Sequence, residues 1–203
     1  ASDVYKRQEH KKSAAEILRS LSKIPQTDEL TRRDLYDIAR TVIGRYVNGA
    51  ILKAEVLYTE KSPISELEET MKLGEALMKA MSELLGSHED YSLFETLVRL
   101  QKVEQVNPNF EITLKNNAES AYCRSYIYEN AEYLYLPEMR LLFGEVKKAA
   151  TENRAIDYCS IAEKSAKIRD SYFRIPLSDM KKDVASFSET VVHAAELIEK
   201  LEL

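Results

Sequence analysis

Apolar residues recur every three or four positions along most of this chain, and strict alternation of apolar and polar residues is almost absent. Such series run from Leu35 to Ala50 and from Met180 to Ile198. This spacing puts the apolar side chains of a segment on one helix face, so it predicts amphipathic helices around a shared core. The clearest series, with alternating steps of four and three, is Leu67, Met71, Gly74, Met78, Met81 and Leu85.

We therefore predict an all-α fold, a single irregular bundle of about seven helices. The first boundary is at Thr27-Asp28, where a side-chain oxygen can accept from the free N–H groups of a helix start. The predicted helices cover residues 9–23, 28–60, 65–85, 90–105, 116–150, 153–173 and 178–202.

Other boundaries rest on capping residues and glycine. Ser65 and Glu68 form a capping box, and Ser178 or Asp179 is expected to cap the last helix. Gly86 is expected to end a helix in the left-handed conformation that glycine tolerates.

Two segments depart from the regular pattern. Pro137 lies inside the predicted helix 116–150, where proline removes a hydrogen bond, so a kink is expected near Leu136. Residues 110–114 (FEITL) alternate between apolar and polar, which favours a short extended piece.

The net charge of the 203-residue chain is -5. An acidic chain is poorly suited to binding a phosphate backbone, so we expect no nucleic-acid partner. No apolar run reaches the roughly 18 residues of a membrane span, so no membrane partner is expected. Cys123 and Cys159 lie in helical patterns and are interpreted as small core residues, with a disulfide between them as the alternative.

Motifs for catalysis and cofactor binding are scarce. The sequence has no glycine-rich phosphate loop, CxxC or HExxH. We predict no cofactor, no metal and no catalytic residue in this chain. The nearest approach to a metal site is Glu189, His193 and Glu196 on one helix face, which is too few ligands and is typical of a surface histidine among acids. A metal-binding bundle stays an alternative on these residues alone.

Tyrosines gather in residues 121–143, AYCRSYIYENAEYLYLPEMRLLF. Tyr122, Tyr126 and Tyr133 are spaced to share one helix face. Tyrosine joins a flat apolar ring to a hydroxyl, which suits core edges, interfaces and sugar stacking. All three roles stay open on the pattern alone.

This stretch resembles the C-terminal all-helical domain of glycoside hydrolase family 89, the alpha-N-acetylglucosaminidases. Tyr122 matches the first tyrosine of a family helix, Tyr135 and Pro137 a later pair, and Leu141 to Phe143 an apolar run. Residues 110–114 resemble the segment before that helix, and residues 29–40 (ELTRRDLYDIAR) an earlier family helix. Here Cys123-Arg124 and Glu138-Met139 replace the family's Ala-Asn and Arg-Trp.

The resemblance implies an accessory domain that packs against an upstream catalytic barrel and is inactive alone. The barrel would carry both carboxylates of a retaining glycosidase acting on glycans with terminal alpha-linked N-acetylglucosamine. On this reading the partners are that barrel and, through it, the glycan. The residues expected at the substrate or interdomain contact are Tyr122, Arg124, Tyr126, Tyr133 and Tyr135.

Residues 3–8, DVYKRQ, bear on the start of the domain. One codon set for them resembles a transposon end sequence used in preparing DNA for sequencing. We interpret residues 1–8 as a sequencing or cloning scar and residues 9–203 as the helical domain. A frame cut upstream of Glu9 would also explain the absence of catalytic motifs, because the barrel would be lost.

The alternative function is a self-contained helical bundle acting as a protein-interaction module. Its basis is the methionine-containing series Leu67–Leu85, because methionine side chains adapt to varied partners.

Overall fold

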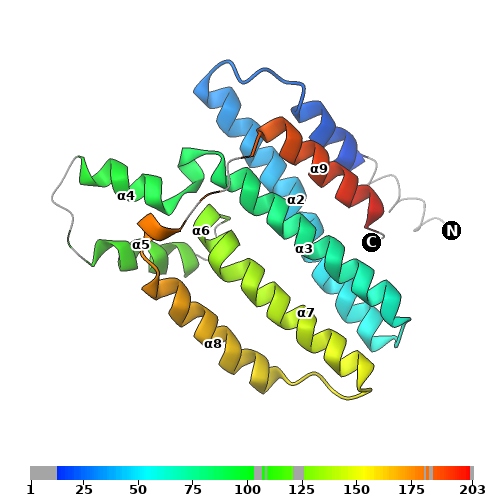
Figure 1. Ribbon diagram of the computed structural model, residues 1–203. Helices are drawn as coiled ribbons and strands as arrows, with labels where there is room; N and C mark the ends of the chain where they lie inside the picture. The colour runs from blue at the N-terminus through cyan, green and yellow to red at the C-terminus, as the bar shows by residue number, and fades with distance from the viewer. Residues whose placement is uncertain are drawn as a thin grey trace.

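The computed structural model describes residues 13–102, 107, 109–120, 126–180, 182 and 185–201. Every regular element in these residues is a helix, and the helices pack as one bundle (Figure 1). The predicted all-α bundle is thus confirmed. Residues 1–8, interpreted as a scar, lie outside the described residues.

A helix over residues 13–21 comes first. The longer helices after it are α2 (Glu29–Thr59), α3 (Ile64–Gly86), α4 (Leu93–Gln101), α5 (Phe110–Glu119), α7 (Leu136–Thr151), α8 (Tyr158–Arg174) and α9 (Phe187–Lys200). Short turns are the 3-10 helices η1 (Glu89–Tyr91) and η3 (Leu177–Asp179), the α-helical turn α6 (Tyr128–Asn130) and the π-helical turn η2 (Ala131–Tyr135).

Helix α3 is at the centre of the bundle. It packs against α2, α9 and α7, and Figure 1 shows α2 and α3 as an antiparallel pair with α7 alongside α3 and α8 outside α7. The predicted seam from Leu67 to Leu85 is buried, with Met71 5%, Met78 2% and Met81 0% exposed. The seam therefore forms this chain's own core and is not available to a partner.

The helix starts follow the predictions only in part. Asp28 is the N-cap of α2, and its carboxylate accepts from the backbone N–H of Thr31 at 2.9 Å, which confirms the first boundary. The capping box at Ser65 is wrong, because α3 begins one residue earlier with Pro63 at the N-cap. The last helix begins at Phe187 rather than 178, and Ser178 and Asp179 belong to η3.

Gly86 does end α3, but not in the expected conformation. No glycine among the described residues has a positive φ. A Cβ at position 86 would lie 3.0 Å from the ring of Tyr128. The absence of a side chain is needed here for the close approach of an aromatic ring, and not for a left-handed turn.

Residues 110–114 are helical and not extended. Phe110 and Leu114 pack against the core and Ala118 is buried, a spacing of four that outweighs the short alternation. The predicted helix 116–150 is likewise two pieces, because α5 ends at Glu119 and the next helix starts at Tyr128.

The irregularity expected at Pro137 is present as a π turn. The N–H of Leu136 bonds to the carbonyl of Ala131, five residues back. Proline has no N–H and crowds the carbonyl four residues earlier. The wider turn directly before Pro137 accommodates the ring, so the helical path continues from Tyr128 to Thr151.

Cys159 contradicts the core interpretation, because it is a free and exposed thiol on α8. Only Tyr172 of α8 is buried, so this helix lies at the edge of the bundle and its helical pattern does not mark a core face. Cys123 lies outside the described residues.

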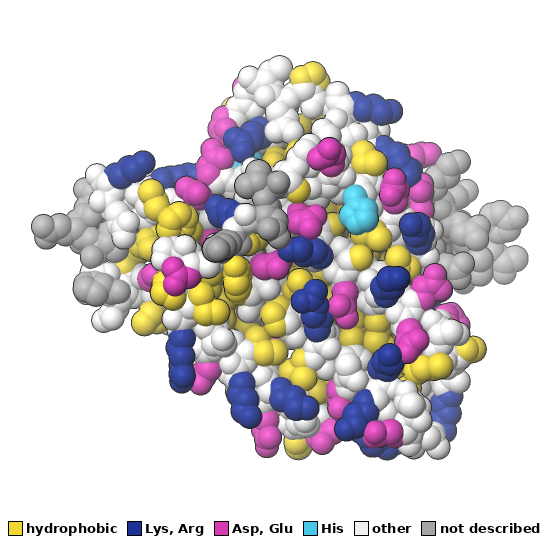
Figure 2. Space-filling model, in the orientation of Figure 1, with side chains coloured by type: hydrophobic (Ala, Val, Ile, Leu, Met, Phe, Trp, Pro, Cys, Tyr) yellow, Lys and Arg dark blue, Asp and Glu magenta, His cyan; other side chains and the backbone are white. Residues whose placement is uncertain are grey.

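Charged side chains of both signs are interspersed on the face drawn in Figure 2. Ion pairs also cross the groove between α3 and α7, where Arg140 pairs with Glu75 at 3.2 Å and Lys147 with Glu68 at 2.7 Å. Exposed pairs of this kind contribute less than about 1 kcal/mol each, so burial around α3 dominates stability.

Candidate functional site

The structure places the predicted contact tyrosines in different surroundings. Tyr126 precedes α6, so Tyr126 and Tyr133 do not share a helix face as predicted. Tyr133 packs edge to face with Tyr128, with ring centroids 6.3 Å apart, whereas Tyr126 and Tyr135 line one cleft. Tyr122 and Arg124 lie outside the described residues.

This cleft, which we call the tyrosine cleft, has a volume of about 320 Å³ and lies between α2, α7 and α8. That volume is at the lower end of the range of ligand pockets. Its described lining is Val47, Asn48, Ile51, Met78, Tyr126, Tyr135, Glu138, Met139, Leu141, Leu142, Ile161 and Ser165. The polar side chains are few, and Ser165 donates to the Glu138 carboxylate at 2.6 Å.

The tyrosine walls are supported from behind. The ring of Tyr126 lies against the backbone of α2 at Gly44, where an added Cβ would be 3.1 Å from the ring. Asn130 donates to the hydroxyl of Tyr135 at 3.3 Å and accepts from that of Tyr172 at 2.5 Å. Burial raises the pKa of Tyr172, so its hydroxyl stays a donor. One wall of the cleft, Tyr135, is therefore hydrogen-bonded to buried polar groups, and the other, Tyr126, packs against α2.

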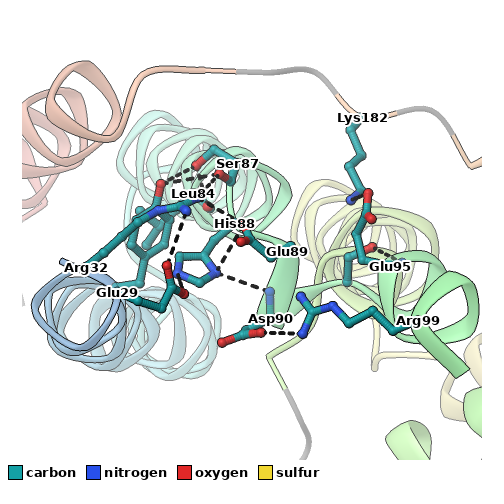
Figure 3. A network of polar contacts seen from close by, with 12 residues as sticks. Glu29, Arg32, Leu84, Ser87, His88, Glu89, Asp90, Glu95, Arg99 and Lys182 are labelled. Atoms are coloured by element: carbon teal, nitrogen blue, oxygen red, sulfur yellow. Dashed lines mark hydrogen bonds and ion pairs between the residues drawn. The ribbon is translucent and has the colours of Figure 1, made fainter. Parts of the chain in front are cut away.

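A second polar cluster, which we call the His88 junction, lies where α3 ends and η1 begins (Figure 3). The His88 side chain is 0% exposed. Its Nδ1 accepts from the backbone N–H of Asp90 at 3.1 Å, and its Nε2 has no hydrogen-bond partner. The nearest carboxylate to Nε2 is that of Glu29, 3.8 Å away.

The sequence analysis did not identify this cluster. Glu29, His88 and Asp90 each place one atom that could bind a metal ion within 4.8 Å of the other two. Its hydrogen bonding is wrong for a metal. A metal-bound histidine donates from its other ring nitrogen. Here the other nitrogen, Nδ1, accepts, so Nε2 carries the proton and is a donor. Arg32 also pairs with Glu89 at 3.1 Å and approaches Glu29 at 3.7 Å.

Glu189, His193 and Glu196 are all exposed on α9. Among the described residues, the ligand atoms that lie close enough to share one metal ion are those of Glu29, His88 and Asp90, and not those of the α9 residues. The structure therefore adds nothing to the metal-binding alternative.

Two buried charged residues stabilise helix ends, and no sequence pattern selects either of them. Glu129, 0% exposed, accepts from Ser92 Oγ at 2.7 Å, Leu93 N at 2.8 Å and Phe94 N at 3.1 Å, at the N-terminus of α4. Lys115, 1% exposed, donates to the carbonyls of Tyr172 and Ile175 at the C-terminus of α8. Opposite charges at these two kinds of end are what the helix dipole favours.

No protein-family model and no curated protein matches this chain. None of the helices in the described part of the chain has the length and hydropathy that a membrane crossing requires.

Proposed function

We propose that this chain is a helical accessory domain of a glycoside hydrolase resembling the alpha-N-acetylglucosaminidases. It packs against an upstream catalytic barrel and does not catalyse alone. The observation that carries the proposal is the tyrosine cleft. It is lined by Tyr126 and Tyr135, and both belong to residues 121–143, the stretch that resembles family 89. Arg124 and Tyr122 of that stretch belong to the same proposed contact.

The chemistry of the cleft supports this role. Tyrosine rings offer flat apolar faces, and Asn48, Glu138 and Ser165 add hydrogen-bonding groups at the same place. Such a surface suits a sugar ring or the side chains of an adjoining domain. Fixed walls reduce the entropy lost on binding.

The buried charges support a structural role for this chain. Glu129 and Lys115 each hydrogen-bond to the end of a helix, so both buried charges serve the packing of this chain. The catalytic carboxylates of the proposal would come from the barrel.

The first experiment is a hydrolysis assay of the purified chain with an aryl alpha-N-acetylglucosaminide. The expected result is no rate above that of buffer. Turnover that co-purifies with the chain would contradict the proposal.

The second experiment uses the chain joined to its catalytic domain. Tyr126→Ala removes one wall of the cleft and is expected to lower kcat/KM or the melting temperature of the joined enzyme. Tyr158→Ala, at a site that is 65% exposed on α8, is the matched control and should leave both unchanged. Equal behaviour of the two variants would argue against a contact at the cleft.

The alternative, a self-contained interaction module, now rests on a different feature from the buried methionine seam. Ile38, Leu52 and Val56 lie on one side of α2 and are 45%, 62% and 51% exposed. A chain that stays monomeric at high concentration and retains no partner in a pull-down would weigh against this alternative.

A further inference from the structure

His88 lies in a cluster of aromatic rings that connects α2, α3 and α9, and its own ring contacts are edge to face. Its ring packs against Tyr36 of α2 at 4.6 Å and Tyr91 of η1 at 5.2 Å. Tyr36 in turn packs against Phe187, the first residue of α9, at 4.7 Å, and its hydroxyl bonds to Ser87 Oγ at 2.8 Å. The His88 junction thus joins the start of α2, the end of α3 and the start of α9.

Charged groups approach His88 from several elements. α2 brings Glu29 and Arg32, and η1 brings Glu89 and Asp90. Asp90 is itself paired with Arg99 of α4 at 2.8 Å. From α9, the apolar ring of Phe187 approaches through its contact with Tyr36. The three carboxylates described near His88 therefore already interact with an arginine: Glu29 and Glu89 with Arg32, and Asp90 with Arg99.

A proton added to His88 has no suitable place. The nitrogen that would take the proton is Nδ1, because Nε2 already carries one. Nδ1 accepts from the N–H of Asp90, and once protonated it would face that donor with another donor. The charged ring would also be fully buried. Consistent with this geometry, burial and then the neighbouring Arg32 lower the pKa of His88.

We propose that His88 is an acid-sensitive latch, whose protonation breaks its bond to the Asp90 N–H and loosens the contacts among α2, η1 and α9. The rest of the core around α3 and α7 stays closed. Opening exposes the ring cluster of Tyr36, Tyr91 and Phe187.

The pH window follows from the sign of the shift. The unperturbed pKa of histidine is 6.5, and the closed junction lowers it. The latch is therefore fully closed above pH 6.5 and weakens as the pH falls from 6.5 toward the lowered pKa. Because opening takes up one proton, the equilibrium constant for opening rises up to roughly tenfold per pH unit in this window.

Hydrogen exchange measured at pH 7.5 and pH 5.0, corrected for the intrinsic pH dependence of exchange, tests the latch. Exchange is expected to rise at low pH in residues 29–36, 84–92 and 187–191, but not in residues 139–149 of α7. His88→Asn keeps an oxygen that can accept from the Asp90 N–H but cannot titrate, so the acid response of the junction should disappear. His193→Asn, at an exposed histidine of α9, should keep it.

Equal exchange of the junction at both pH values would overturn the proposal, as would an unchanged acid response in His88→Asn. If His88→Asn does not fold, an NMR titration of the unaltered protein decides the matter. A measured pKa for His88 below 6.5 supports the latch, and a value at or above 6.5 overturns it.

Discussion

Gly74 and Gly144 are both inside helices, yet their surroundings are opposite. A Cβ at Gly74 would lie 2.9 Å from the Cβ of Ala50 on α2 and 3.0 Å from the Met139 methyl group. A Cβ at Gly144 would meet nothing within 4 Å. Gly74 therefore allows α2, α3 and α7 to approach closely, and Gly144 has no such role.

Replacing each glycine by alanine should change stability in opposite directions. Gly74→Ala is expected to destabilise the fold by about 1–3 kcal/mol. The new methyl group would meet the Cβ of Ala50, which is bonded directly to the α2 backbone and cannot move away easily. Gly144→Ala should stabilise it by about 0.5–1 kcal/mol through helix propensity. Urea unfolding measures both, and the same sign for the two variants would contradict the packing described at α3.

Glu129 should be costly to change. Glu129→Gln replaces an acceptor of three hydrogen bonds with a group that also donates, so we expect a loss of about 2 kcal/mol or more in the free energy of unfolding. Glu68→Gln, at an exposed pair with Lys147, is the control and should have a much smaller effect. A loss no larger than that of the control would show that Glu129 does not anchor α4.

At the scale of elements, α2 and α7 end in the same way. Lys61, with φ 53°, follows α2, and Asn153, with φ 48°, follows α7. In each case the next N–H bonds back across the last turn, from Ser62 to Leu57 and from Arg154 to Ala149. This closure normally places glycine at the left-handed position.

Lys61→Gly should therefore stabilise the protein by about 1 kcal/mol, because a side chain in the left-handed region is strained. Lys61→Ala keeps a Cβ and should bring no such gain, and Asn153→Gly should gain less because asparagine tolerates this conformation. Thermal unfolding of the three variants distinguishes them. A gain for Lys61→Ala equal to that for Lys61→Gly would show that the strain is not the cause.

Most helices and the central seam were predictable, because they depend on local spacing. Asp28 acts on Thr31, three residues away, and the Leu67–Leu85 series is buried as its period indicates. The starts of α3 and α9 and the break before Tyr128 were not predicted, because the residues there also satisfy other local patterns. Burial decides among those patterns, and it depends on contacts distant in sequence.

The candidate sites show the same division. Tyr126 and Tyr135 were selected from the tyrosine-rich composition of their stretch. The cleft also needs Gly44 of α2 and the side chains of α8, and residue spacing within one helix does not predict that these lie next to the tyrosines. Glu129 meets Leu93 across 36 positions and Lys115 meets Tyr172 across 57, so neither role could be read from the sequence. His88 was missed because its partner, Asp90, gives no recognisable motif.

At the scale of the whole molecule, the described residues form a bundle with a cleft that is lined by Tyr126 and Tyr135, both from the stretch 121–143 that resembles family 89. We propose that this bundle is one domain of a larger enzyme. In that enzyme the described part of the chain would supply the scaffold and the contact surface, and the barrel would supply the reaction.

The most direct measurement is the coding sequence upstream of the codon for Glu9, followed by expression of whatever frame continues there. The account predicts an open frame encoding a barrel with two catalytic carboxylates, and a joined protein that hydrolyses alpha-linked N-acetylglucosaminides while the bundle alone does not. A stop codon upstream and a start codon near Glu9 would contradict it, and the chain would then be a complete helical protein.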